Sequence, residues 1–237
     1  MAGTADLARR AGVVARWPFG MALTSWRYMW RIRALHRTEE EGGARDRPPD
    51  IPGDLDDDKV QKVGDGAGPL FHRRYGIRIE DSDLTPEALF AKIAGDPNAA
   101  APVEVAVFRK ISGREGPVRR GEEYVVRMPG PWDGPVRVVD RTPTSFRLAT
   151  LDGHLEAGQI EFRACRERDA LRFEIESWAR NGDWMSSVLY SRLRLAKEMQ
   201  LHMWTHFCER VAKLSGGRIS GGITIHTRRV EPRDLGV

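Results

Sequence analysis

The middle of the chain is a series of short strand-like segments joined by turns, and this series limits the fold more than any other feature. A connection between parallel strands needs a dozen or more residues, and the turns here are shorter, so these strands should pair antiparallel. The expected strands are Phe71–Glu80, Val103–Lys110, Glu122–Met128, Pro135–Arg141, Ser145–Leu151, Gln159–Cys165 and Leu171–Trp178.

Alternation along the later strands shows that one face of the sheet is apolar and the other polar. Ile160 and Phe162 alternate with charged or amide side chains, and the segment from Leu171 to Ile175 repeats the pattern. Successive side chains of a strand point to opposite faces, so the apolar set shares one face. That face needs a covering element.

A long amphipathic helix over about 184–214 is the predicted cover. At about 1.5 Å per residue it would be roughly 45 Å long, enough to cross a small sheet. A shorter helix should start at Thr85-Pro86-Glu87 and end near Ile93. The apolar stripe of the long helix comprises Leu189, Leu193, Ala196, Met203, Phe207, Val211 and Leu214. We therefore predict an α+β fold over 70–216, with a curved antiparallel sheet of about seven strands wrapped around a long C-terminal helix.

Three further segments flank this domain. Residues 1–37 are rich in arginine and aromatic residues and predict a helical arm. The helix would either lie on an anionic membrane surface or pack on a protein partner or its own domain. The remaining alternative is that the segment is disordered. The arm's candidate contacts are Trp17, Trp26, Trp30, Arg27 and Arg31. Residues 38–69, rich in Pro, Gly and Asp, predict a linker or a strap over the surface, and 217–237 a C-terminal tail.

Composition excludes several classes of protein. The arm carries seven arginines against Asp6, so the rest of the chain is slightly acidic, and the basic total is no indication of nucleic-acid binding by the folded domain. Two cysteines, outside any CxxC pair, favour a reducing compartment. No glycine-rich nucleotide motif occurs, and no cofactor is expected. A cytoplasmic location, with or without membrane association, is the expectation.

Three stretches of sequence carry a family resemblance: MPGPWDGPVRVV (128–139), TLDGHLEAGQIEF (150–162) and LAKEMQLHMW (195–204). With the order of elements, they make residues 70–216 resemble the START-like (SRPBCC) helix-grip superfamily. Within it they resemble an uncharacterised branch catalogued as a domain of unknown function. The resemblance implies a cavity for a hydrophobic small molecule, lipid or polyketide-like, and specifies no reaction.

The candidate ligand site lies where the long helix meets the sheet. Gln200 falls on the apolar stripe, so its amide needs partners, either from a strand or from a ligand head group. Trp132, in a Pro- and Gly-rich loop, is either a lid or a plug, and the other aromatics either pack or line a cavity. The candidate lining residues are Trp132, Trp178, Tyr190, Gln200, Met203, Trp204 and Phe207.

Catalysis has one weak candidate pair, His154 and Glu156. These residues are either a general acid/base pair of a cyclase or hydrolase, or parts of a hairpin whose histidine hydrogen-bonds a backbone carbonyl. His202 and His206 have a spacing that can hold zinc on a helix, but no third ligand follows and the helical pattern turns His202 to solvent, so no metal is expected.

Overall fold

A computed structural model describes residues 34–102, 106–128, 133–182 and 190–235, with the backbone alone for 190–199. The N-terminal arm contacts, Trp132 and the side chain of Tyr190 therefore lie outside the described part of the protein. The elements in chain order are β1 (Leu35–Glu41), η1 (Ala44–Asp46), η2 (Val63–Asp65), β2 (Gly66–Glu80), α2 (Pro86–Gly95), α3 (Pro97–Ala100), β3 (Val107–Ser112), β4 (Glu123–Arg127), β5 (Asp133–Thr142), β6 (Ser145–Thr150), β7 (Glu156–Glu167), β8 (Ala170–Gly182), α4 (Tyr190–Leu214), β9 (Arg218–Val230) and α5 (Pro232–Leu235).

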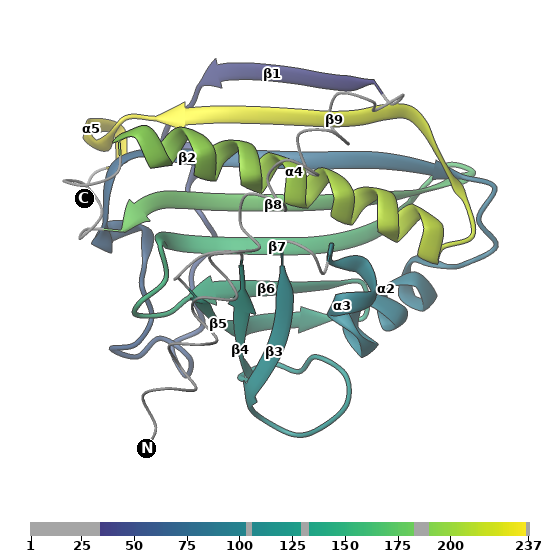
Figure 1. Ribbon diagram of the computed structural model, residues 1–237, viewed down its shortest axis with the longest axis horizontal. Helices are drawn as coiled ribbons and strands as arrows, with labels where there is room; N and C mark the ends of the chain where they lie inside the picture. Colours follow the sequence, from purple (N-terminus) through teal and green to yellow (C-terminus); the bar gives the residue numbers. More distant parts are fainter. Residues whose placement is uncertain (1–33, 103–105, 129–132, 183–189, 236–237) are drawn as a thin grey trace, which may run out of the picture.

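The described strands form one curved sheet in the order β1-β9-β2-β8-β7-β6-β5-β4-β3. All pairs from β9 to β3 are antiparallel, as the short connections predict, and β1 pairs parallel with β9. Figure 1 shows the curvature: β3 and β4 stand upright in the view, whereas β7, β8 and β9 run horizontally. The α+β helix-grip fold is therefore confirmed.

The described part of the sheet has nine strands, and not the expected seven, because both ends of the chain extend it beyond β2. Residues 217–237, expected as a tail, contain β9, which pairs with β2 from Leu70↔Val230 to Glu80↔Arg218. Gly221 and Gly222 have positive φ angles of 74° and 83°, next to the register shift in the β2–β9 pairing. This bulge breaks the alternation of β9 and hides it in the sequence.

Residues 47–62 form the strap, which crosses the convex face of the sheet, opposite α4. The strap is hydrogen-bonded to the C-terminal end of β6, where Gln61 N donates to Thr150 O at 2.9 Å. Arg137, Arg147 and Gln159 donate to its carbonyl groups. Val60 packs there on Val139, Ala149 and Leu151. The strap interpretation of this segment therefore describes it better than a loose linker.

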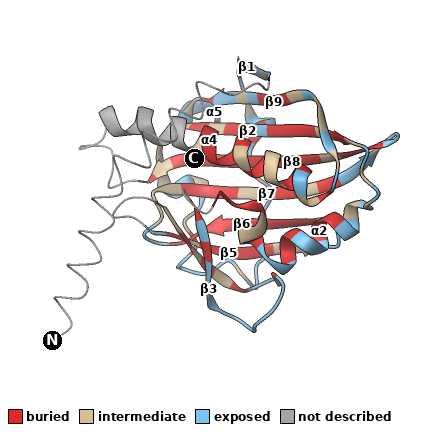
Figure 2. Ribbon diagram, turned by 45° about the vertical axis from the view of Figure 1, so that its right-hand side comes forward, coloured by how far each residue is buried: buried red, intermediate tan, exposed pale blue. Residues whose placement is uncertain are grey.

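The concave face carries the main core, covered by α4, α2 and α3 (Figures 1 and 2). Thr85 caps α2 by accepting a hydrogen bond from Ala88 N at 3.2 Å, and Pro86 occupies the first turn, as predicted. Aromatic rings fill the space under the C-terminal half of α4: Phe162 lies 5.1 Å from Phe207 and 4.9 Å from Phe146, between ring centroids. Such packing makes this end of the interior solid.

The convex face holds a buried charged cluster, the clasp, formed by Asp46, His72 and Glu176. His72 Nδ1 lies 2.9 Å from Asp46 Oδ1, and His72 Nε2 lies 2.7 Å from Glu176 Oε1. All three side chains are 3–5% exposed. The clasp ties η1, which follows β1, to β2 and β8.

Hydrogen bonds outweigh burial in setting the charge of the clasp. Burial alone would raise the pKa of the Glu176 carboxyl, but hydrogen bonds from His72 and Arg74 lower this pKa to about 2. For Asp46, burial is again outweighed, by the Gly43 N–H and by His72, and the pKa of the carboxyl is lowered. Ionised carboxylates can only accept hydrogen bonds, and each ring nitrogen of His72 faces one of these two carboxylates.

Trp178 belongs to this convex face, which corrects its assignment to the ligand cavity. Its ring stacks on His72 with centroids 5.3 Å apart and packs with Leu70, Val230 and Leu235. The apolar face of β8 consists of odd-numbered residues such as Phe173 and Ile175, so an even-numbered residue must point away from α4.

Candidate functional site

Four side chains form a polar group inside the interface between the sheet and α4, which we name the interior polar cluster. Its members are Arg73 and Tyr75 from β2, Glu156 from β7, and Gln200 from α4. Gln200 Nε2 donates to Glu156 Oε2 at 2.6 Å, and Arg73 Nη1 approaches Gln200 Oε1 at 3.5 Å. Gln200 therefore bridges a guanidinium and a carboxyl, and its amide has one orientation.

Strand parity places these residues on the concave face. Arg73 and Tyr75 alternate with His72 and Arg74, whose side chains contact Glu176 on the convex face. Gln200 lies one helical turn before Trp204 and shares the face of α4 that packs on the sheet. The prediction that Gln200 faces the sheet agrees with this arrangement, and a strand residue, Glu156, supplies its partner.

Arg73 is positioned without a counter-charge. No carboxylate oxygen of the described residues lies within 4.0 Å of its guanidinium, which sits 4.7 Å from the centroid of the Phe71 ring. Other arginines on the same sheet, for example Arg163 and Arg172, have such partners. Arg147 and Arg180 also lack a carboxylate partner but donate to backbone carbonyls, whereas the one hydrogen bond observed for the Arg73 guanidinium within the described residues is the long contact to Gln200.

Burial dominates the ionisation of the other members. Burial raises the pKa of the Glu156 carboxyl, although Arg73 and the hydrogen bond from Gln200 oppose the rise. Burial also raises the pKa of Tyr75 to about 12, so its hydroxyl keeps its proton. Tyr75 is 2% exposed, and its hydroxyl has no hydrogen-bond partner within the described residues. The cluster thus combines the guanidinium of Arg73 with a carboxyl and a hydroxyl whose pKa values are raised by burial.

The interior is accessible at the cluster and filled beyond it. Phe162, Phe173 and Phe207 are at most 1% exposed. Toward the start of β7, however, Ile160, Glu156 and Gln200 remain half-buried although they face the space between the sheet and α4. The partial burial of these three side chains contrasts with the complete burial of the aromatic core.

His154 does not form the expected acid/base pair with Glu156. Its Nδ1 accepts a hydrogen bond from the backbone N–H of Glu156 at 2.9 Å, whereas the Glu156 side chain binds Gln200. The ring lies against Gly134, where an added Cβ would be 2.9 Å from Nε2. Burial lowers the pKa of His154 to about 4. The hairpin interpretation is the correct one, since the histidine orders a turn.

The remaining residues that were predicted to line a ligand cavity are mostly packed in the hydrophobic core. Met203, Trp204 and Phe207 are buried in the core, with Trp204 edge-on to Phe162 at 5.5 Å. His202 is 6% exposed, so the expectation that it faces solvent is wrong. Within the described residues, no group of three His, Cys, Asp or Glu side chains could hold a metal ion.

Sequence reasoning missed Arg73 and Tyr75. The signal was present in FHRRYGIRIE, where Arg73 shares a face with Tyr75, Ile77 and Ile79. An arginine on the apolar face of a strand is an exception that points to a buried polar site. We used the alternation in this segment only to predict a strand, and not to predict which face of the sheet Arg73 occupies.

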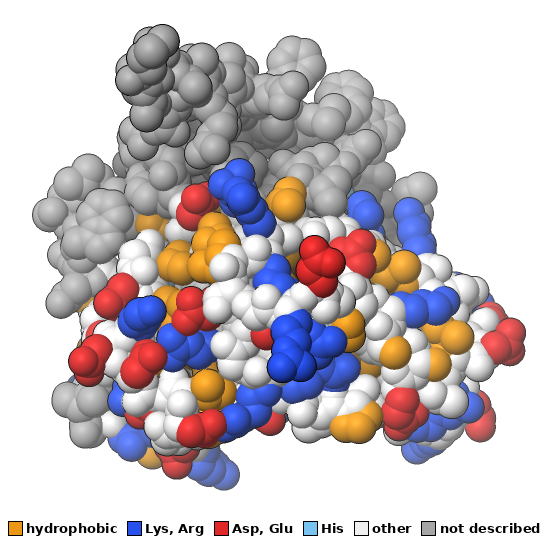
Figure 3. Space-filling model, turned by 90° about the horizontal axis from the view of Figure 1, so that it is seen from below, with side chains coloured by type: hydrophobic (Ala, Val, Ile, Leu, Met, Phe, Trp, Pro, Cys, Tyr) orange, Lys and Arg blue, Asp and Glu red, His pale blue; other side chains and the backbone are white. Residues whose placement is uncertain are grey.

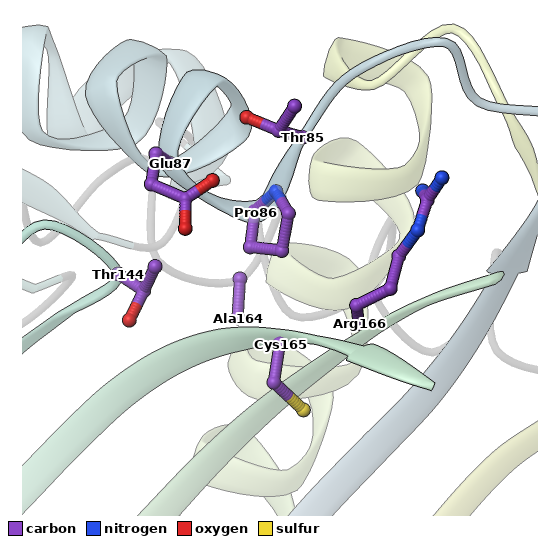
Figure 4. A pocket seen from close by; sticks show the side chains of 7 residues that line it. All are labelled: Thr85, Pro86, Glu87, Thr144, Ala164, Cys165 and Arg166. Atoms are coloured by element: carbon purple, nitrogen blue, oxygen red, sulfur yellow. The ribbon is translucent and has the colours of Figure 1, made fainter. Parts of the chain in front are cut away.

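A separate surface pocket of about 440 Å³ opens near the start of α2 (Figure 4). Its walls combine a helix start with the far end of β7, which is about 30 Å along the strand from Glu156. The lining residues are Thr85, Pro86, Glu87, Thr144, Ala164, Cys165 and Arg166. None of the residues of the interior polar cluster reaches it.

The face of the molecule shown in Figure 3 carries a mixture of side-chain types. Seen from below, Lys and Arg side chains intermingle with Asp and Glu, and hydrophobic side chains form small separate groups (Figure 3). The large hydrophobic residues exposed on the described surface are Val107 and Ile111 on the edge strand β3. Among the described helices, none is sufficiently long and apolar to cross a membrane.

Comparison with known proteins identifies the domain. A family model described as "Domain of unknown function (DUF1990)" matches residues 97–210. No curated protein matches the chain. Similar solved structures include Ara h 8.0201 (8% identity, 60% of this chain, 97% of that chain, TM-score 0.42) and major latex-like protein 151 from Panax ginseng (10%, 61%, 97%, 0.42).

A third similar structure is the di-domain ARO/CYC StfQ from the steffimycin biosynthetic pathway, with 8% identity over 62% of this chain and a TM-score of 0.48. This chain covers 51% of that larger protein. The antiparallel sheet wrapped around α4 is itself the helix-grip arrangement that the sequence motifs indicate. Residues 97–210 thus match the DUF1990 family model, and the described sheet and α4 have the helix-grip arrangement.

Proposed function

We propose that this protein binds a hydrophobic small molecule, lipid or polyketide-like, between the sheet and α4. The observation that carries the proposal is the interior polar cluster, at the end of an otherwise apolar interface. A few fixed polar groups beside apolar walls are the usual composition of a small-molecule site. A cluster needed for folding alone would be expected to satisfy the charge of Arg73 internally.

The walls of the proposed site come from the described apolar residues next to the cluster. Ile160 of β7 and Met128 after β4 are partly buried against the core and keep exposed surface. Trp204 and Met203 close the site toward the aromatic core. A ligand would therefore bury its apolar part against Ile160 and Trp204 and place its polar part beside Gln200.

Titration with a neutral solvatochromic dye tests the proposal. We expect saturable binding of about one dye per chain by the wild type and about tenfold weaker binding by Ile160→Trp, which adds bulk to the proposed space. Glu167→Trp, at the exposed end of the same strand, is the matched control and should bind as the wild type does. Absence of binding by the wild type, or equal binding by Ile160→Trp, would contradict the proposal.

A further inference from the structure

The chemistry of the interior polar cluster narrows the class of ligand, and this inference rests on the proposed function. Arg73 offers a planar array of N–H donors, of which one makes a long contact of 3.5 Å to Gln200. Its other donors meet no carboxylate within the described residues. A guanidinium pairs best with a planar carboxylate, through two parallel hydrogen bonds.

The neighbours of Arg73 favour an anion over a neutral head group. Tyr75, two residues along the same face of β2, has a hydroxyl that can donate. Gln200 Oε1 faces Arg73, and the amide nitrogen faces Glu156, so the bridge holds the carboxyl of Glu156 away from the guanidinium. Within the described residues, no carboxylate is in direct contact with Arg73 to offset its positive charge.

The carboxyl of Glu156 is the one group that could repel an anion here. Burial favours its protonated form, and a protonated carboxyl is a hydrogen-bond donor. A doubly charged phosphate would carry more charge than the guanidinium of Arg73 balances, and it would sit next to the carboxyl of Glu156. A singly charged carboxylate needs no more than Arg73 supplies.

We infer that the ligand is an apolar carboxylic acid, whose carboxylate binds Arg73 and whose chain extends along Ile160 and Trp204. The guanidinium is already oriented by the Phe71 ring and by Gln200, so little side-chain freedom is lost on binding. The acid supplies the carboxylate that the described residues do not place beside Arg73.

Calorimetric titration of dodecanoate, dodecanol and methyl dodecanoate at pH 7 tests the inference. The three probes share a chain and differ in charge. We expect the wild type to bind dodecanoate about tenfold more tightly than either neutral compound. Equal binding of acid and alcohol would overturn this inference and leave the proposed function intact, whereas binding of none of the three would overturn both.

Variants assign the preference to Arg73. Arg73→Gln should bind dodecanol as the wild type does, which also shows that it folds, and should lose the preference for dodecanoate. Arg73→Lys should keep part of it. Arg78→Gln, on the convex face of the same strand, should keep all of it. Persistence of the preference in Arg73→Gln, or its loss in Arg78→Gln, would overturn the inference.

Discussion

Replacing His72 by phenylalanine isolates the electrostatic role of the clasp. Phenylalanine retains a ring that can stack on Trp178, but it leaves Asp46 and Glu176 without their shared donor. Removing one partner of a buried ion pair costs about 3–5 kcal/mol, because an uncompensated charge stays buried. Arg74 and Arg163 still contact Glu176, so the lower end of this range applies. We expect the free energy of unfolding at pH 7 to fall by about 3 kcal/mol.

The pH dependence of this loss gives a second test. The folded pKa of Glu176, about 2, lies below its ordinary value of 4.5, so its contribution is complete above pH 4.5 and is lost as the pH falls toward 2. The difference between wild type and His72→Phe should therefore shrink at about pH 3. Urea unfolding followed by circular dichroism measures both values.

An exposed ion pair on the same face is the control for the clasp. Arg172 contacts Glu174 at 2.6 Å but is 42% exposed, so Arg172→Ala should cost less than about 1 kcal/mol. A loss below about 1 kcal/mol for His72→Phe at pH 7, or a larger loss at acid pH, would refute the electrostatic account of the clasp.

Three further outcomes follow from the described contacts. The His154 ring should stay neutral, as the Nε2–H tautomer, down to about pH 5 by NMR, because burial lowers its pKa to about 4. The unfolded chain then binds the proton first, so this residue lowers the stability of the fold as the pH falls below 6.5. A titration of the ring near pH 6.5 would contradict its placement. Phe207→Ala should lower the free energy of unfolding by about 3–5 kcal/mol, and a loss under about 1 kcal/mol would show that the core is less filled than described. Gly158→Ala should cost more than about 2 kcal/mol, since φ is 155° and the new Cβ would lie 1.8 Å from Trp178 O; unfolding like the wild type would contradict this approach of the backbones.

Local patterns predicted the central sheet and α4 because each strand records its burial in its own sequence. The alternation around Phe162 and Phe173 is sufficient to assign a dry face. By contrast, β1 is mostly exposed and pairs with β9 across almost the whole chain, so its sequence carries no such alternation. The strap was recognisable only as a segment with little to bury, and its partners on β5–β7 depend on the completed sheet.

The candidate site was predicted in part for the same reason. Gln200 was found because helical spacing places it among apolar residues, whereas its bridge to Arg73 joins residues 127 positions apart. Trp178 was assigned to the wrong face, although parity with Ile175 would have shown its direction. The clasp joins three distant segments and leaves no signal in any one of them.

A crystal structure with ω-bromododecanoate measures the central claim most directly, because anomalous scattering locates the bromine. The carboxylate should lie within hydrogen-bonding distance of the Arg73 guanidinium, with the bromine between the sheet and α4, near Ile160 or Trp204. A bromine in the surface pocket beside Thr85 and Cys165, or an interior closed by side chains around Gln200, would contradict the account.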